Sequence, residues 1–172
     1  MKQLFIILSM LLMATTPLYA QRQKSQKTPV TTQAQKDLAR FYVTKAIMNG
    51  RDVTAQIAGN KVYTVFYETS DGALHMANVW EKQKSQSWGP ILNMKSKQYP
   101  QTERSYKVDL FTFDWAFSNS YDSKRGVCQV TFTKTYKPEG VISTLTMRQE
   151  SGEVTEYIGY MEGSVNFHKY RY

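Results

Sequence analysis

The stretch YKVDLFTFDWAFS, residues 106–118, decides the fold class of this 172-residue chain. Side chains on a β-strand point alternately to its two faces, so residues two apart share a face. One face of this stretch is made of large aromatic side chains: Phe111, Phe113, Trp115 and Phe117. The stretch therefore predicts a strand with an aromatic wall on one side.

Similar runs of β-branched and aromatic residues fill most of the chain after residue 40, and turn-forming residues separate them. Asp71-Gly72 lies between two such runs, which is a strong hairpin signal. No 3.6-residue periodicity is sustained, so helices are not expected to dominate. The predicted strands are residues 41–48, 61–68, 73–82, 106–118, 127–136, 141–148, 153–161 and 165–171.

Residues 84–104 contain Gly89-Pro90 and Tyr99-Pro100 and show no clean period, so we expect a long loop there. Eight strands with short connections predict an all-β fold: a single antiparallel eight-stranded up-and-down barrel, which has no free sheet edge. A flat sandwich of the same strands is the alternative. A barrel of this size is either filled by side chains or holds one small ligand.

Composition excludes two small-protein classes. The chain has one cysteine, Cys128, and two histidines, His75 and His168, which lie far apart in the sequence. One cysteine cannot form an internal disulfide, and this set lacks the clustered spacing of a structural zinc site. Cys128 alternates with Val130 and Phe132 and is expected in the core, so neither a disulfide scaffold nor a metal site is predicted.

The first twenty residues have the parts of a secretory signal peptide. Lys2 precedes a largely apolar run of about ten residues, and Ala20 is a small residue at the expected cleavage point. Residues 21–36 are rich in Gln, Lys and Thr and contain no acidic residue, which predicts a flexible, disordered basic linker. Residues 37–172 form the predicted barrel domain, and the expected location is outside the cytoplasm, periplasmic or extracellular.

The net charge of +8 does not indicate a nucleic-acid partner. One surplus cation belongs to the signal peptide and four to residues 21–36, while residues 37–172 hold 17 Lys and Arg against 14 Asp and Glu, or +3. These charges are scattered among turns and form no basic stripe interleaved with aromatic residues. We therefore expect no nucleic-acid binding.

No motif for catalysis or cofactor binding stands out. His75 shares a face with Ala77 and Val79, which indicates a partly buried structural imidazole. Glu153 and Glu156 are three apart on a predicted strand and so point to opposite faces, which does not suit an acid and base pair. No calcium loop, phosphate loop, Gly-x-Ser-x-Gly or His-Glu-x-x-His sequence occurs. We predict neither an enzyme nor a cofactor.

The sequence FYVTKAIMNGRDVT, residues 41–54, resembles the opening of bacterial lipocalin-like, or calycin-like, secreted domains. The shared pattern is a first strand, a loop of the form Asn-Gly-x-Asp-Val-Thr and then a meander, and it extends over residues 41–172. Arg40-Phe41-Tyr42 stands where true lipocalins have Gly-x-Trp, and Arg171 lies near the position of the arginine that closes their barrel. The resemblance implies a binding scaffold without catalysis.

Aromatic residues are the candidates for a ligand site, since tyrosine and tryptophan offer an apolar body with a polar tip. The candidate ligand-binding residues are Phe111, Phe113, Trp115, Phe117, Tyr63, Tyr67, Trp80 and Tyr157. The function expected is an exported, non-catalytic protein that binds a small apolar or amphipathic ligand.

Two alternatives remain open. One is an envelope interaction or structural protein with a filled barrel, which contacts a partner through residues 84–104. The other is a small outer-membrane barrel, because the chain ends in Tyr170-Arg171-Tyr172. Against it, the apolar face of residues 128–136 contains Lys134, and a cation at bilayer depth costs about 2–4 kcal/mol. A membrane-bound form is therefore not expected after signal cleavage.

Overall fold

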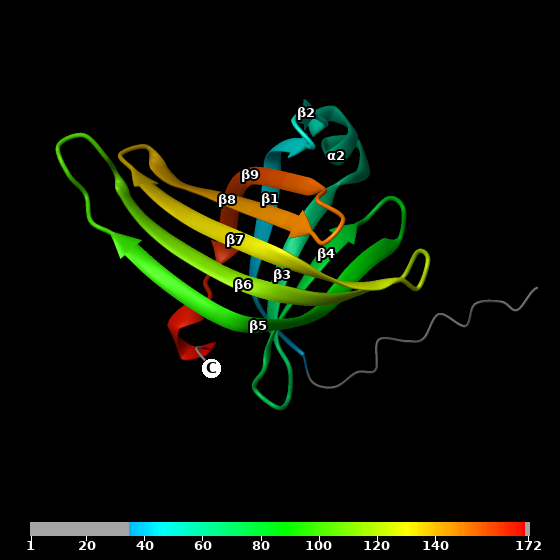
Figure 1. Ribbon diagram of the computed structural model, residues 1–172. Helices are drawn as coiled ribbons and strands as arrows, with labels where there is room; N and C mark the ends of the chain where they lie inside the picture. Colours follow the sequence, from blue (N-terminus) through cyan, green and yellow to red (C-terminus); the bar gives the residue numbers. More distant parts are fainter. Residues whose placement is uncertain (1–34, 171–172) are drawn as a thin grey trace, which may run out of the picture. The chain divides into compact units, whose positions relative to one another are not determined.

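The computed structural model describes residues 35–170, which form antiparallel strands with two short helices (Figure 1). The elements are β1 (Lys36–Met48), β2 (Arg51–Asp52), α2 (Thr54–Asn60), β3 (Val62–Glu68), β4 (Leu74–Trp80), β5 (Ser85–Tyr99), β6 (Lys107–Asn119), β7 (Arg125–Lys137), β8 (Gly140–Gln149), β9 (Val154–Gly163) and the 3₁₀ helix η1 (Phe167–Tyr170). The predicted signal peptide, residues 21–34 of the predicted linker and Arg171 lie outside the described residues.

Eight of these strands close into a ring. Each strand from β3 to β9 pairs with its neighbour in the chain, and β1 pairs with β3 on one side and with β9 on the other. The two-residue β2 only extends β1. The prediction of an eight-stranded antiparallel up-and-down barrel is confirmed, and the sandwich alternative is excluded, because no edge is left between β1 and β9.

Two of the predicted elements were wrong. One strand was predicted as a loop and one helix was predicted as a strand, so the total of eight strands was still correct. Residues 84–104 are mostly the 15-residue strand β5, whereas residues 165–171 contain η1 in place of a strand. The register of β5 against β6 shifts between Leu92 and Lys95, and Asn93 has a φ of 54°. This irregularity breaks the two-residue period, and Pro90 is a residue that strands rarely accommodate. The sequence pattern of β5 therefore resembles a loop.

Gly89 explains part of the composition of β5. A β-carbon at this position would lie 1.8 Å from the carbonyl oxygen of Ala116 on β6. Only glycine permits this close approach of two strands. A residue that signals a turn in the sequence is here required by packing within the barrel wall.

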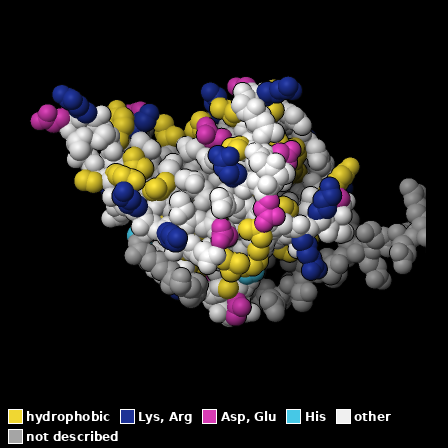
Figure 2. All heavy atoms as spheres, in the orientation of Figure 1, with side chains coloured by type: hydrophobic (Ala, Val, Ile, Leu, Met, Phe, Trp, Pro, Cys, Tyr) yellow, Lys and Arg dark blue, Asp and Glu magenta, His cyan; other side chains and the backbone are white. Residues whose placement is uncertain are grey.

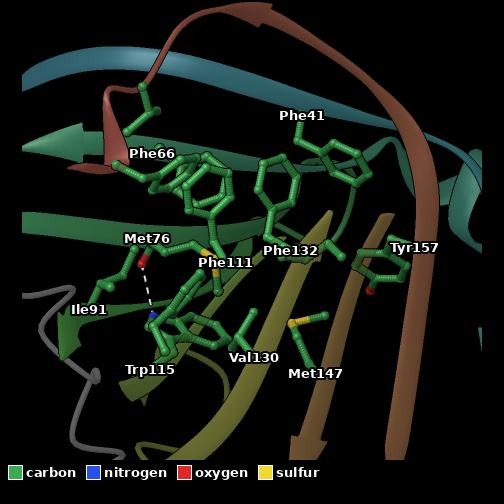
Figure 3. Close-up of a cluster of buried hydrophobic side chains, with 14 of the residues drawn as sticks. Phe41, Phe66, Met76, Ile91, Phe111, Trp115, Val130, Phe132, Met147 and Tyr157 are labelled. Carbon is green, nitrogen blue, oxygen red and sulfur yellow. Dashed lines mark hydrogen bonds between the residues drawn. The ribbon is translucent and has the colours of Figure 1, made fainter. Parts of the chain in front are cut away.

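One half of the barrel interior is filled by phenylalanine. We call its five buried residues the phenylalanine cluster: Phe41, Phe66, Phe111, Phe132 and Phe167. Their rings contact one another at centroid distances from 4.6 Å for Phe111 and Phe167 to 6.4 Å for Phe111 and Phe132. Figure 3 shows four of them packed together, with Trp115 and Met147 to one side. Edge-on, tilted and stacked ring pairs of this kind fill this part of the core.

The helix η1 closes the barrel at the end where β3 meets β4. Its Phe167 joins the phenylalanine cluster, and its Lys169 and Tyr170 both hydrogen-bond the carboxylate of Glu68 at the end of β3. The Lys169 Nζ also forms an ion pair with that carboxylate. These contacts hold η1 against the barrel wall.

The inward position of Lys134 changes one inference from the sequence. Residues 128–136 do alternate, but their apolar face points into the barrel, and Lys134 Nζ lies 5.9 Å from the ring centre of Phe132 and 5.7 Å from that of Phe167. Burial lowers the pKa of the Lys134 ammonium, and Asp109 opposes that shift. Lys134 is therefore no guide to what the outer face contacts.

The helix α2 lies at the other end of the barrel, between β2 and β3. Its one buried side chain, Ile57, joins the core, and the helix packs against β1. Because α2 is only seven residues long, it covers part of that end and leaves the rest open. Within residues 35–170, neither α2 nor η1 is a helix of the length and apolarity needed to cross a membrane.

Candidate functional site

A cavity of about 480 Å³ opens at the barrel end where β6, β8 and β4 finish and β7 begins. Its apolar wall consists of aromatic, sulfur-containing and aliphatic side chains: Met48, Trp80, Trp115, Phe117, Val127, Cys128, Met147 and Tyr157. Polar and charged residues complete it: Asn78, Ser87, Asn119, Asp122, Lys124, Arg125, Gln149, Glu150, Ser151 and Thr155. We call this space the mouth cavity.

The structure brings together half of the ligand residues proposed from the sequence. Trp80, Trp115, Phe117 and Tyr157 line the mouth cavity. Phe111 and Phe113 also point inward, but they are buried in the core beyond the cavity lining. The two-residue alternation of β6 is thus observed, and the wall is divided between a packed part and an open part.

Tyr63 and Tyr67 lie on the outer face of the barrel. Tyr67 packs with Val65 and Ala77 in a second hydrophobic cluster that is separate from the core, and Tyr63 borders it. Neither tyrosine lines the mouth cavity, so both are left out of the proposed ligand site. The partly buried His75 lies beside Tyr67, and burial lowers the pKa of its imidazole.

Trp115 is the most firmly positioned residue of the wall. Its side chain is 3% exposed, and its Nε1 donates a hydrogen bond to the carbonyl oxygen of Met76 at 3.1 Å (Figure 3). The ring of Phe117 lies 5.1 Å from it at an angle of 36°. A tryptophan whose only donor is already satisfied presents an apolar aromatic surface to the cavity.

Cys128 and Met147 place two sulfur atoms next to this aromatic surface. Cys128 is a free thiol, 3% exposed, as its alternation with Val130 and Phe132 predicted. Burial, together with the negative charge of Glu150, raises the pKa of the Cys128 thiol to about 11. A thiol in this state is a small apolar group and not a nucleophile.

Asn78 is the functional candidate that the sequence analysis missed. It lies inward on β4 between Met76 and Trp80 and is 6% exposed. Its side-chain amide hydrogen-bonds the Tyr157 hydroxyl, which opposes the rise of the Tyr157 pKa to about 12 that burial causes. The Asn78 Oδ1 atom, by contrast, has no hydrogen-bond partner within residues 35–170. An amide in an otherwise apolar alternation, Leu74, Met76, Asn78 and Trp80, was the available signal.

The rim of the mouth cavity carries charges of both signs. Lys124 Nζ lies 3.1 Å from a carboxylate oxygen of Asp122, and this contact lowers the pKa of Asp122. Arg125 and Glu150 add one charge of each sign. The rim is therefore close to neutral and favours neither an anionic nor a cationic ligand.

A second hollow, of about 510 Å³, lies over the irregular part of β5. Its lining includes the outward side chains Thr112, Asp114, Gln129 and Thr131, and Asn93 donates a hydrogen bond to Asp114 at 2.6 Å. A hollow lined largely by polar groups that water also reaches gives little affinity for an apolar ligand. The mouth cavity is therefore the better candidate.

The described residues contain no group of His, Cys, Asp and Glu side chains arranged to hold a metal ion. No protein-family model, curated protein or solved structure matches the chain.

Proposed function

We propose that this chain is an exported, non-catalytic binding protein, lipocalin-like in design, which takes a small apolar or amphipathic ligand into the mouth cavity. The observation that supports it is the contrast within one barrel between a half that is filled by phenylalanine and a half that is hollow. A volume of about 480 Å³ is in the range of small-molecule sites, about 300–1,000 Å³. Contact with its apolar wall would remove a ligand's apolar surface from water, and this burial favours the bound state.

The outer face favours a barrel surrounded by water over the outer-membrane alternative. Asp114 on β6 pairs with Gln129 on β7, and Gln129 pairs with Arg148 on β8. These three residues alternate with inward ones and form a polar row across the sheet, and Glu156 on β9 lies near its end. Arginine at bilayer depth costs about 2–4 kcal/mol. A continuous apolar band is thus missing from β6, β7 and β8.

Two tryptophans on neighbouring strands supply a matched test of the site. Trp80 ends β4 and lines the mouth cavity, whereas Trp88 on β5 packs on the outer cluster around Val65 and Ala77. Both are partly buried. The probe is N-phenyl-1-naphthylamine, a neutral apolar dye that fluoresces when it leaves water. We expect saturable binding to the wild-type protein, at least tenfold weaker binding to Trp80→Ala, and unchanged binding to Trp88→Ala.

The outcome that contradicts the proposal is equally specific. Equal loss of dye binding in the two variants, or no saturable binding to a folded wild-type protein, would exclude the mouth cavity as the site. Native mass spectrometry of protein purified from its own host complements the dye. A reproducible bound mass that Trp80→Ala loses and Trp88→Ala keeps supports ligand carriage.

A second candidate function is docking on an anionic lipid surface, and the far ends of two hairpins favour it. Tyr99, Tyr106 and Val141 are 41–44% exposed where the β5–β6 and β7–β8 hairpins project. Lys97 lies 4.7 Å from the ring centre of Tyr99, and Lys137 lies 5.7 Å from that of Tyr106. At the upper left of Figure 2, hydrophobic, basic and acidic side chains lie side by side over these projecting ends, and Lys137 is paired with Glu139 there. Tyrosine and lysine together suit a membrane interface.

From the sequence, residues 84–104 were expected to be a loop that contacts a partner. Most of that segment is β5 within the barrel wall, so this second candidate places the contact at the hairpin ends. Co-sedimentation with phosphatidylglycerol vesicles tests it, with phosphatidylcholine vesicles for comparison. We expect binding only to the anionic vesicles and its loss in a Tyr99→Ser, Tyr106→Ser double variant. Equal sedimentation of this variant and the wild type would exclude these hairpin ends.

A further inference from the structure

Among the described residues that line the mouth cavity, Asn78 has a buried polar atom without a hydrogen-bond partner, and that atom indicates what kind of ligand fits. The Asn78 Oδ1 atom is shielded from water and accepts no hydrogen bond from residues 35–170. A buried acceptor left unpaired destabilises the folded protein. In native proteins a buried polar group almost always has a hydrogen-bond partner, so an exception calls for an explanation such as a bound water or ligand. Asn78 is one of the residues that line the mouth cavity, so a molecule bound there lies next to its side chain.

Two of the neighbouring donor groups are already engaged. Trp115 Nε1 donates to the Met76 carbonyl oxygen, and the Asn78 amide is engaged with the Tyr157 hydroxyl. Thr64, which pairs with Asn78 across β3 and β4, is completely buried, and its Oγ1 also has no partner in the described part of the chain. The Thr64 hydroxyl is itself a donor, but it does not bond Asn78 Oδ1, because neither atom has a hydrogen-bond partner among residues 35–170. The donor that Asn78 Oδ1 lacks must therefore come from the ligand.

The charges of the site indicate that this donor is neutral. Asp122, Lys124, Arg125 and Glu150 are rim residues, and the side chains around Asn78 are Met76, Trp80 and Tyr157. A charged group at Asn78 would lose its hydration without gaining an opposite charge, which costs far more than one hydrogen bond returns. A neutral hydroxyl or N–H group fits this position, whereas a carboxylate offers neither charge compensation nor a donor.

The walls favour a flat ring. Trp115 and Phe117 present adjacent faces at 36°, and Trp80 and Tyr157 add two further aromatic surfaces. Aromatic rings that stack offset or edge-on attract one another beyond the effect of the area they bury. The sulfur atoms of Met147 and Cys128 add polarisable contacts. A rigid ring also loses less rotational freedom on binding than a flexible chain.

We infer that the mouth cavity selects a flat, neutral aromatic molecule that carries a hydroxyl or N–H donor and places that donor on Asn78 Oδ1. This inference rests on the proposed function, because it assumes that the cavity is the ligand site. It adds the ligand's shape, its charge and the residue that orients it.

A pair of probes that differ by one donor tests the inference. 2-Naphthol donates a hydrogen bond through its hydroxyl group, and 2-methoxynaphthalene has the same ring with a methyl group in place of that proton. Affinities are measured by quenching of tryptophan fluorescence in the wild-type protein, in Asn78→Leu and in Thr155→Val. The last variant removes a hydroxyl group from the same cavity but keeps Asn78.

We expect the ratio of the two affinities to change only when Asn78 is replaced. In Asn78→Leu the preference for 2-naphthol should fall by about tenfold relative to the wild type, because one hydrogen bond is lost, while Thr155→Val keeps the wild-type ratio. A ratio that is the same in the wild type and Asn78→Leu overturns the role of Asn78. Asn78→Ala, which also leaves no acceptor at this position, is the second variant if Asn78→Leu does not fold, and the same fall is expected of it.

A flexible probe separates shape from polarity, and the dye separates this inference from the proposed function. 1-Decanol has a hydroxyl group and as many heavy atoms as 2-naphthol, and we expect it to compete more weakly; stronger competition overturns the requirement for a flat ring. If N-phenyl-1-naphthylamine binds and is lost in Trp80→Ala while the naphthalene pair is not distinguished, only the further inference fails. If the dye does not bind the folded protein either, both fail.

Discussion

The two halves of the barrel interior are built by the same strands with different side chains. β6 contributes Phe111 to the phenylalanine cluster and Trp115 to the mouth cavity, and β7 contributes Phe132 to the first and Cys128 to the second. The filled half is packed with rings that have no polar atom. The hollow half combines tryptophan, tyrosine, asparagine and sulfur, which are residues with a polar or polarisable group to offer a ligand.

The alternation of side chains identifies which residues point into the barrel, but it does not show whether they fill the interior. A period of two indicates which residues face the barrel axis, and it is the same in both halves. Whether that interior is filled depends on what closes each end. η1 inserts Phe167 among the other phenylalanines, whereas α2 inserts Ile57 and covers only part of its end.

Removing a ring from the filled half should have the largest effect. Phe132 is completely buried and contacts Phe41, Phe66, Phe111 and Phe167. Phe132→Ala should lower the free energy of unfolding by about 3–5 kcal/mol, because it leaves a cavity among rigid neighbours. Urea denaturation followed by circular dichroism measures it. A loss below about 1 kcal/mol would show that this half is not tightly packed.

Removing one hydrogen bond from the wall of the hollow half should cost less. Trp115→Phe keeps an aromatic ring but leaves the Met76 carbonyl oxygen without its donor. The free energy of unfolding should fall by about 1–3 kcal/mol. The affinity for N-phenyl-1-naphthylamine should fall with it, since the wall loses surface. An unchanged affinity would indicate that the dye does not contact Trp115, and Phe132→Ala serves as the comparison for a change outside the wall.

Acid should loosen the closed end locally. The hydrogen bonds from Lys169 and Tyr170 hold the pKa of Glu68 below its ordinary value of 4.5. A carboxylate with a lowered pKa in the folded state stabilises that state above pH 4.5, and this contribution is lost as the pH falls through the lowered value. Hydrogen exchange of residues 167–170 should therefore rise, relative to residues 111–117, as the pH falls below 4.5. Glu68→Gln should show the fast exchange already near neutral pH, and a pH response that persists in this variant would assign the effect to another group.

Cys128 gives the gentlest probe of the hollow half, because labelling it requires no substitution. A thiol pKa of about 11 in place of the ordinary 9.0 reduces the thiolate fraction about 100-fold. Reaction with a disulfide reagent near neutral pH should be at least this much slower than in denatured protein, and a saturating ligand should slow it further. Labelling as fast as in denatured protein would mean that the hollow half opens to solvent.

Much of the fold was readable from residues 106–118 and the turns, and the reasons for the failures are physical. β5 was missed because Gly89 and Pro90, normally signs of a turn, stand inside a strand that a register shift also interrupts. Residues 165–171 alternate as a strand would, but Phe167 and Tyr170 are three apart in a 3₁₀ turn and both are buried.

The candidate site was half readable. Trp80, Trp115, Phe117 and Tyr157 follow from alternation, whereas Tyr63 and Tyr67 are equally aromatic and lie outside, because their strand presents Val62, Thr64 and Phe66 inward. No feature of the neighbouring sequence distinguishes the aromatic residues that line the cavity from the two tyrosines outside it. The alternation of β4 marks Asn78 as an inward amide, but its unpartnered Oδ1 atom is seen only in the folded structure, because hydrogen-bond partners come from neighbouring strands.

The pairing of β1 with β9 constrains the order in which the parts of this protein fold. Thr44 bonds the carbonyl oxygen of Ile158, a contact between residues 114 positions apart, so the seam cannot form until nearly the whole domain is available. Hairpins such as β3–β4 and β7–β8 can form early, but they leave an open edge at each side of a growing sheet. Contacts of such long range slow folding. Until β9 pairs with β1, the open sheet edges can pair with another copy of the chain. The pairing of these two strands removes both edges.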